Sequence, residues 1–131
     1  MNFNKYFHKA FIGLILGDGH LCKRSLKSNV YFTITLAEKY ILLAHFIQNI
    51  FKDFMTPKGF REYKVQSSKG SKYFGRFVIT TKSFSSFNSY HDMFYTAQTN
   101  NLNKYIKILP FNIEELLTPV VLAFFIMGDG N

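Results

Sequence analysis

The stretch FIGLILGDG, residues 11–19, is an apolar run that ends in an aspartate between two glycines, and LAFFIMGDG, residues 122–130, ends in the same way. Both runs predict buried helices. An aspartate after a helix lies beside the negative end of the helix dipole and beside carbonyls without intrahelical partners, which costs about 0.3–1 kcal/mol. A single copy would be explained as a helix-ending turn, whereas two copies, at Asp18 and Asp129, favour a functional role.

A bound divalent cation would make both carboxylates favourable. Carboxylate and free carbonyl oxygens at a helix end are hard oxygen ligands that suit Mg²⁺. Gly13 and Gly17 are four residues apart, so a second helix can approach closely and both aspartates can reach one place; the second copy keeps only Gly128. Gly19 and Gly130, just after the aspartates, can adopt a positive φ and turn the chain into a strand. Two aspartates with a metal are typical of phosphodiester hydrolysis.

The composition bounds the class of protein. A length of 131 residues is enough for one domain with a core, and a hydrophobic fraction of 47% is typical of a globular protein. The net charge of +8 favours a polyanionic partner, nucleic acid or an anionic membrane, with ordinary surface charge as the alternative. A single cysteine, Cys22, excludes a disulfide framework. The apolar runs at 10–17 and 119–127 are shorter than the roughly 20 residues of a membrane-spanning helix, so no membrane segment is expected.

Hydrophobic periodicity predicts an alternation of helices and hairpins. Within 30–36, Phe32, Ile34 and Leu36 alternate with other side chains, as in a half-buried strand. The predicted order is a helix over 5–17, strands over 20–24 and 30–36, a helix over 38–54, strands over 60–67 and 72–81, a helix over 83–96, a connector over 99–112, a short helical turn over 112–119 and a final helix from Pro119. The fold class is therefore α+β, with one complete αββαββα unit and the first helix of a second unit.

Positive charge is concentrated on the predicted hairpins. Within 19–82 and outside the helix over 38–54, ten Lys and Arg residues stand against one acid, Glu62. Cations at the rim of a sheet suit phosphates and short polar side chains suit base edges, so this pattern favours nucleic acid over a solvated surface. The sequence contains no basic amphipathic helix, which disfavours a membrane surface. If Leu21 faces the core, alternation turns outward His20, Cys22 and Arg24, and with them Tyr31, Thr33 and Thr35. On the second hairpin the predicted outward sets are Lys64 with Gln66 and Arg76 with Thr80. The predicted nucleic-acid contacts are Arg24, Lys27, Tyr31, Thr33, Thr35, Arg61, Lys64, Gln66, Lys69, Lys72 and Arg76.

The two motifs resemble those of the LAGLIDADG homing endonuclease family in its single-chain, two-motif form. Each motif has its aspartate in eighth place, and 129 − 18 = 111 residues separate the two, about one repeat. The αββαββα order is also that of the family, and the resemblance covers the whole chain. Both motifs replace the inner acid and alanine of the family name, and Phe124 stands where the first motif has Gly13.

The resemblance implies site-specific cleavage of double-stranded DNA. It implies an antiparallel four-stranded saddle sheet over the major groove and cuts that leave short 3′ overhangs. It places Asp18 and Asp129 on Mg²⁺, together with the backbone oxygens of Gly17 and Gly128. In some members a lysine before an x-I/L-P segment assists at the active site, and the segment KILP gives Lys107 that role; the alternative is an exposed lysine on a connector.

The resemblance also bears on organisation and origin. It implies a first domain over 1–113 and a second motif helix over 114–131, so we expect the N-terminal part of a longer enzyme or an inactive remnant, with apolar surface exposed on the last helix. Such enzymes are encoded in mobile introns of mitochondria or other organelles, and the Phe-, Tyr-, Ile-, Asn- and Lys-rich composition agrees with an AT-rich genome. Relatives act as maturases, so binding of intron RNA is an alternative function. No small-molecule substrate is expected.

Overall fold

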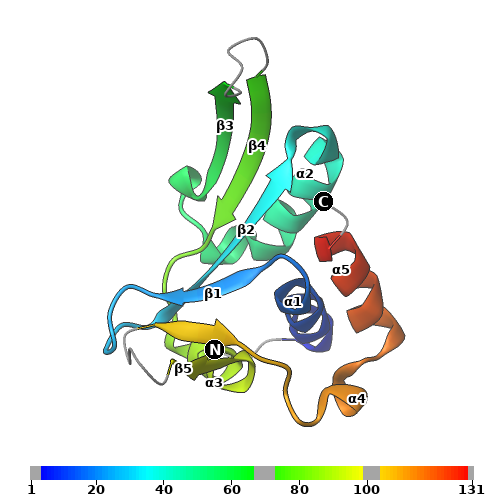
Figure 1. Cartoon of the computed structure of the whole chain (residues 1–131). Coiled ribbons are helices and arrows are strands. Elements are labelled where there is room, and N and C mark those ends of the chain that lie inside the picture. Colours follow the sequence, from blue (N-terminus) through cyan, green and yellow to red (C-terminus); the bar gives the residue numbers. More distant parts are fainter. Residues whose placement is uncertain (1–3, 67–72, 99–103, 130–131) are drawn as a thin grey trace.

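The computed structural model describes residues 4–66, 73–98 and 104–129, without the side chains of 65, 66, 73, 74, 128 and 129. The helices are α1 (Lys5–Leu16), α2 (Ile41–Phe51), α3 (Asn88–Phe94), α4 (Ile113–Leu116) and α5 (Pro119–Asp129). The strands are β1 (His20–Lys23), β2 (Val30–Ala37), β3 (Phe60–Gln66), β4 (Tyr73–Thr80), β5 (Tyr95–Ala97) and β6 (Tyr105–Lys107). Short 3₁₀ turns extend α2 at both ends and precede β3 and α3. The predicted order of helices and hairpins is confirmed from α1 to α3 and for α4 and α5, whereas β5 and β6 were not predicted (Figure 1).

Strands β1 to β4 form one antiparallel sheet in the order β1-β2-β4-β3 (Figure 1). The register pairs Leu21 with Phe32 and pairs Ile34 with Ile79, so buried side chains from neighbouring strands share one face. Helices α1 and α2 pack against that face through aromatic rings. The opposite face carries the alternate residues of each strand and stays open to solvent. The antiparallel four-stranded sheet predicted from the family resemblance is therefore present.

A cluster of phenylalanines holds α1 against the sheet and the flanking helices. The ring of Phe11, fully buried, lies 5.3 Å from Phe32 of β2, 5.6 Å from Phe51 of α2 and 4.9 Å from Phe87. Phe32 and Phe51 stack at 4.6 Å. Aromatic pairs contribute about 0.5–1.5 kcal/mol each beyond their buried area, so these contacts fix the helix on the sheet.

The two motif helices, α1 and α5, pack side by side and run in the same direction (Figure 1). They meet at equivalent places in the two motifs, because a Cβ added to Gly13 would lie 2.6 Å from the Cβ of Phe124 and 2.5 Å from the carbonyl oxygen of Val121. The ring of Phe124 then lies 5.7 Å from that of Tyr6. The close approach predicted for Gly13 is confirmed, and it brings the carboxyl ends of both helices to the same end of the pair.

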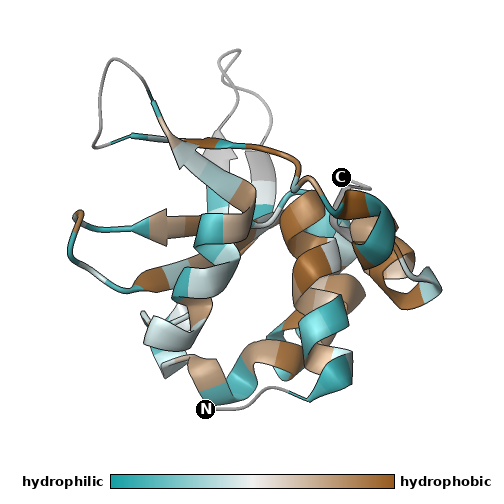
Figure 2. Ribbon diagram, turned by 90° about the horizontal axis from the view of Figure 1, so that it is seen from below, coloured by the Kyte–Doolittle hydropathy of each residue, from teal (hydrophilic) through white to brown (hydrophobic). Residues whose placement is uncertain are grey.

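The outer side of α5 exposes apolar side chains, as expected. Ile126 is 68% exposed and Leu122 is 43% exposed, while Val121 and Phe124 are buried against α1. The apolar residues of both helices are visible in Figure 2. Among the described helices, none combines the length and the hydropathy that a membrane crossing requires.

Two predictions on local structure were wrong. The helix predicted over 83–96 ends at Phe94, and residues from Tyr95 form β5, which pairs with β6 inside the predicted connector over 99–112. Strands of three residues are too short to show a period, and the aromatic spacing continues through Phe94 as in a helix. Gly19 does not adopt a positive φ. A Cβ there would lie 2.6 Å from both the carbonyl oxygen of Leu14 and the Phe32 ring, so close packing explains this glycine; Gly130 lies outside the described residues.

Replacing Gly13 by alanine should lower the free energy of unfolding by about 1–3 kcal/mol, because the added methyl group forces α1 and α5 apart. The expected loss is a net value: the cost of separating the helices outweighs the gain of about 1 kcal/mol that alanine brings over glycine in a helix interior. Urea denaturation followed by circular dichroism measures it. Ala123→Val, which adds volume on the exposed side of α5, is the control and should change stability little. A Gly13→Ala protein as stable as the wild type would contradict the close contact.

Candidate functional site

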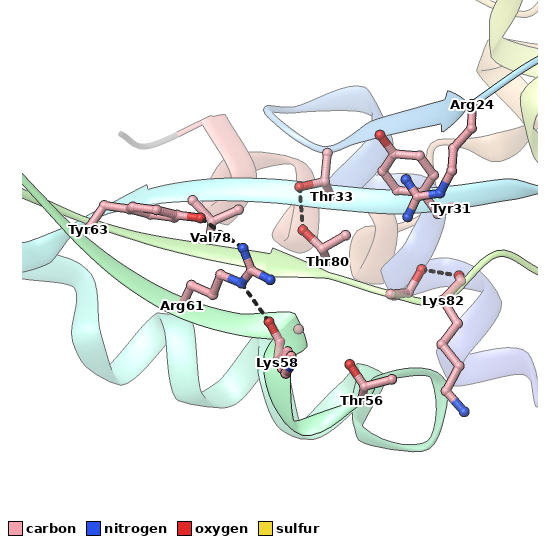
Figure 3. Close-up of a pocket in the computed structure, with 12 residues that line it drawn as sticks. Arg24, Tyr31, Thr33, Thr56, Lys58, Arg61, Tyr63, Val78, Thr80 and Lys82 are labelled. Atoms are coloured by element: carbon pink, nitrogen blue, oxygen red, sulfur yellow. Dashed lines mark hydrogen bonds between the residues drawn. The ribbon is translucent and has the colours of Figure 1, made fainter.

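The open face of the sheet carries hydroxyl and aromatic side chains along β2. Tyr31, Thr33 and Thr35 alternate with buried residues of the same strand, as predicted. The Oγ1 atoms of Thr33 and Thr80, on paired strands, lie 3.1 Å apart and form a hydrogen bond (Figure 3). Short side chains that both donate and accept hydrogen bonds therefore occupy the middle of this face.

A hollow of about 420 Å³ lies on this face between the two hairpins (Figure 3). Four cations line it, one from the turn after β1, one from the 3₁₀ turn before β3, one from β3 and one after β4: Arg24, Lys58, Arg61 and Lys82. Its other walls include Tyr31, Thr33, Thr56, Tyr63, Thr80 and Thr81. No acidic side chain lines this hollow among the described residues. The site thus combines positive charge with neutral hydrogen-bonding groups.

Both arginines of the hollow are held in place. The Nε–H of Arg61 donates to the carbonyl oxygen of Lys58 at 3.0 Å, and its Nη1 lies 3.4 Å from the hydroxyl oxygen of Tyr63 (Figure 3). The guanidinium of Arg24 lies over the ring of Tyr31, 4.4 Å from its centre. These contacts leave further N–H groups of each guanidinium for an outside partner, since arginine has five donors.

Most of the predicted contact residues that the structure describes lie on the open side. Arg24, Tyr31, Thr33 and Arg61 line the hollow, and Arg76 and Thr35 are exposed on the same face. Lys27 lies in the turn after β1, where it lines a second hollow of about 510 Å³ with Lys23, Arg24 and Tyr105. Lys69, Lys72 and the side chain of Gln66 lie outside the described residues.

The outward orientation predicted for Lys64 was wrong. Lys64 pairs with Gly75, two residues from the pair between Glu62 and the buried Phe77, and all of these share the helix-covered face. Side chains on β3 therefore point to the open face at Arg61 and Tyr63. A shift of one residue in the assumed alternation exchanges the two faces of a strand, and only the register resolves it.

Sequence reasoning did not assign Lys58, Lys82 and Thr56 to the site. Both lysines contribute to the positive charge of the hairpins, but they lie outside the strands, where alternation predicts no direction. The 3₁₀ turn Pro57–Gly59 brings Lys58 to the hollow. The backbone N–H of Lys82 donates to the carbonyl oxygen of Phe54 at 2.8 Å, which holds that segment beside the same turn. The strong excess of Lys and Arg over acidic residues on the hairpins was the feature of the sequence that could have indicated these two lysines.

The end of α1 forms a tight turn around Asp18. The N–H of Gly17 donates to the carbonyl oxygen of Gly13 at 3.2 Å, and the N–H of Gly19 donates to that of Leu14 at 2.8 Å. The carbonyls of Gly17 and Gly19 accept hydrogen bonds from the Nζ of Lys107, at 3.0 and 2.8 Å. Lys107 is half-buried, which contradicts the alternative of an exposed connector lysine.

The charges around this turn affect one another. Burial lowers the pKa of Lys107, and the carboxylate of Asp18 opposes that shift. Partial burial lowers the pKa of His20, the positive charge of Lys107 adds to this effect, and Asp18 again opposes it. A lysine, an aspartate and a histidine thus interact electrostatically beneath the edge of the sheet, at the carboxyl end of α1.

At the turn after α1, the groups that fit a metal ion are mainly backbone carbonyl oxygens. In the described part of the chain, no three His, Cys, Asp or Glu side chains gather into a metal-binding cluster. The carbonyls of Gly17 and Gly19 already draw the ammonium of Lys107, which is a cation at the negative end of a helix. This donor set, with the carboxylate of Asp18 in the same turn, fits a divalent ion with oxygen ligands.

The contribution of the second motif remains a prediction. Asp129 is the last residue of α5, and that helix ends beside the end of α1, but the side chains of Gly128 and Asp129 lie outside the described residues. The structure therefore brings the two helix ends together and leaves the meeting of the two carboxylates as an expectation.

The comparisons with known proteins agree with this geometry. Residues 8–131 match the LAGLIDADG DNA endonuclease family. The fold is similar to a solved structure described as the homing endonuclease I-WcaI bound to its DNA recognition sequence, with a TM-score of 0.76 and 17% identity. The match covers 96% of this chain and 51% of that one, so this chain spans about half of its length. A comparison with curated proteins gives no match.

Stability should fall as the pH is lowered below about 6.5. Burial is the main cause that lowers the pKa values of His8, His20 and His91 below 6.5 in the folded protein. The unfolded chain then takes up protons that the folded chain does not, so acid favours unfolding. Urea unfolding between about pH 7.5 and 5.5 measures this dependence. The His91→Phe protein, which keeps a ring against Tyr95 and cannot be protonated, should show a weaker dependence. A wild-type stability that rises towards acid pH would refute it.

Proposed function

The chain belongs to the LAGLIDADG DNA endonuclease family, and from this premise we propose that it binds double-stranded DNA and takes part in cleaving it at a specific site with a divalent metal. The main observation that supports the proposal is the position of the turn at Asp18. Asp18 follows a helix that packs against the second motif helix on one side and against a sheet with a cationic open face on the other.

The open face supports the binding of DNA. Arg24, Lys58, Arg61 and Lys82 supply positive charge for phosphates, which contributes most of the sequence-independent affinity for DNA. The guanidinium groups and threonine hydroxyls between them are suited to base edges in the major groove, which is wide enough for a two-stranded ribbon. A role in homing is supported by the similar solved structure, which is a homing endonuclease bound to its recognition sequence.

The turn at Asp18 supports the chemistry. We propose that Asp18 and the carbonyl of Gly17, with Asp129 and Gly128 from α5, hold Mg²⁺. A bound ion would stabilise the charge that develops on the oxygens of the phosphodiester during hydrolysis. The residues of this chain contribute the ligands and their orientation, because two hydrogen bonds from Lys107 hold the turn and the helix pair fixes its position.

Asp18→Asn should abolish cleavage and leave DNA binding nearly intact. Cleavage should fall more than about a hundredfold, since the loss of an outer-shell partner of a metal ligand alone costs about 10–100-fold. The assay incubates the full chain with a duplex library in Mg²⁺ and sequences the cut ends, and filter binding on the same DNA gives the affinity. Asp53→Asn, an exposed acid after α2, is the control with the same loss of charge. Wild-type protein that binds DNA but cuts none of it, or an Asp18→Asn protein that cuts normally, would refute the proposal.

Arg61→Gln should weaken DNA binding several-fold and reduce the slope of log affinity against log salt by about one, because one phosphate or base contact is lost. Lys5→Gln, which removes an exposed charge from the start of α1, should leave both quantities unchanged. Fluorescence anisotropy with a labelled duplex between about 50 and 200 mM salt measures both. If the chain prefers an RNA of the same length over the DNA duplex, the alternative of a maturase is favoured instead.

A further inference from the structure

Lys107 and the carbonyl proposed as a metal ligand are hydrogen-bonded to each other. The Nζ of Lys107 lies 3.0 Å from the oxygen of Gly17 and 2.8 Å from that of Gly19. These carbonyls belong to the negative end of α1, where a cation is stabilised. A divalent ion that takes the oxygen of Gly17 must therefore share it with an ammonium group or displace that group.

The fold holds Lys107 at this place. Lys107 is the last residue of β6 and pairs with Tyr95 of β5, and the next N–H, that of Ile108, donates to the carbonyl oxygen of Phe94 at 2.7 Å. The hydroxyl of Tyr95 in turn accepts a hydrogen bond from the N–H of Leu21 at 3.0 Å, which ties this small sheet to β1. The side chain starts from a fixed backbone and is half-buried. The position of the Lys107 ammonium group is therefore fixed by the fold, unlike that of an exposed surface lysine.

We infer that Lys107 is an internal cation that competes with a divalent ion for the carbonyl of Gly17 and thereby lowers the metal affinity of the site. This inference rests on the proposed function. Without a metal, the ammonium of Lys107 stabilises the two carbonyl oxygens by hydrogen bonds and is attracted by the carboxylate of Asp18. A divalent ion that bound the same oxygens would be repelled by the ammonium group of Lys107. Lys107 is thus a positioning residue whose effect passes through the turn.

The test is the affinity for Mn²⁺ of proteins in which Lys107 is neutral. Lys107→Met keeps an unbranched side chain only one atom shorter and removes the charge, and Lys107→Gln supplies a neutral amide donor for a carbonyl. Both should bind Mn²⁺ on the order of tenfold more tightly than the wild type, because a unit charge close to the ion is removed. Titration with Mn²⁺, followed by the electron paramagnetic resonance of the free ion, gives the affinity, and circular dichroism verifies the fold.

Lys104→Met is the matched control, because it removes the same charge from an exposed lysine three residues earlier. Its Mn²⁺ affinity should equal that of the wild type. Unchanged or weaker binding in a folded neutral variant of Lys107 would overturn the inference. Weaker binding is the result that a merely structural anchor predicts, since a loosened turn would present its oxygens poorly.

The same titration separates this inference from the proposed function. If the wild type binds Mn²⁺, if Asp18→Asn removes that binding, and if neutral variants of Lys107 bind no more tightly, only the inference fails. If no protein of the set binds Mn²⁺ in a way that depends on Asp18, the proposed metal site and the inference fail together. If the neutral variants bind more tightly and Asp18→Asn abolishes the gain, both are supported.

Discussion

The contact between Gly13 and the backbone of α5 is the constraint on which the arrangement of the site depends. A Cβ at this position would lie 2.5 Å from the carbonyl oxygen of Val121, so the two helices approach as closely as a bare backbone allows. Because they run in the same direction, their carboxyl ends lie at one end of the pair. An apolar helix that ends in an aspartate is unfavourable alone, and a second such helix end beside it adds further negative charge, which a cation at this place would stabilise.

The aromatic core relates this helix pair to the sheet. Phe11 contacts β2, α2 and the segment before α3 at once, so α1 cannot turn without moving several elements. The turn at Asp18 leads directly into β1, whose neighbour β2 carries Tyr31 and Thr33 on the open face. The groups proposed to bind DNA and the groups proposed to cut it are thereby held by one packed core, as precise placement of a site requires.

Much of this could be predicted from the sequence, because the relevant patterns are long or repeated. The two motifs predicted the helix pair, and the alternation of Phe32, Ile34 and Leu36 predicted the faces of β2. The β5–β6 pair was missed because three-residue strands have no readable period. Lys64 was assigned to the wrong face because register depends on pairing with β4, and Lys58 and Lys82 were not assigned because turn geometry sets their direction. Gly19 has to lack a side chain because the Phe32 ring packs against it. Rules on local backbone conformation cannot predict such a contact with a distant residue.

Burial divides the cations of this protein into two kinds with different consequences. Lys58, Arg61 and Lys82 lie on an open face, where solvent screens them and an arriving phosphate can replace water at little cost. Lys107 is half-buried, and its Nζ already donates hydrogen bonds to two carbonyls, so fewer of its N–H groups can contact a phosphate. The missed β5–β6 pair explains the difference, since it carries Lys107 from a distant part of the sequence back to the end of α1. In the sequence, Lys107 is one of the cations that give the net charge of +8. In the fold, it acts on the motif turn itself.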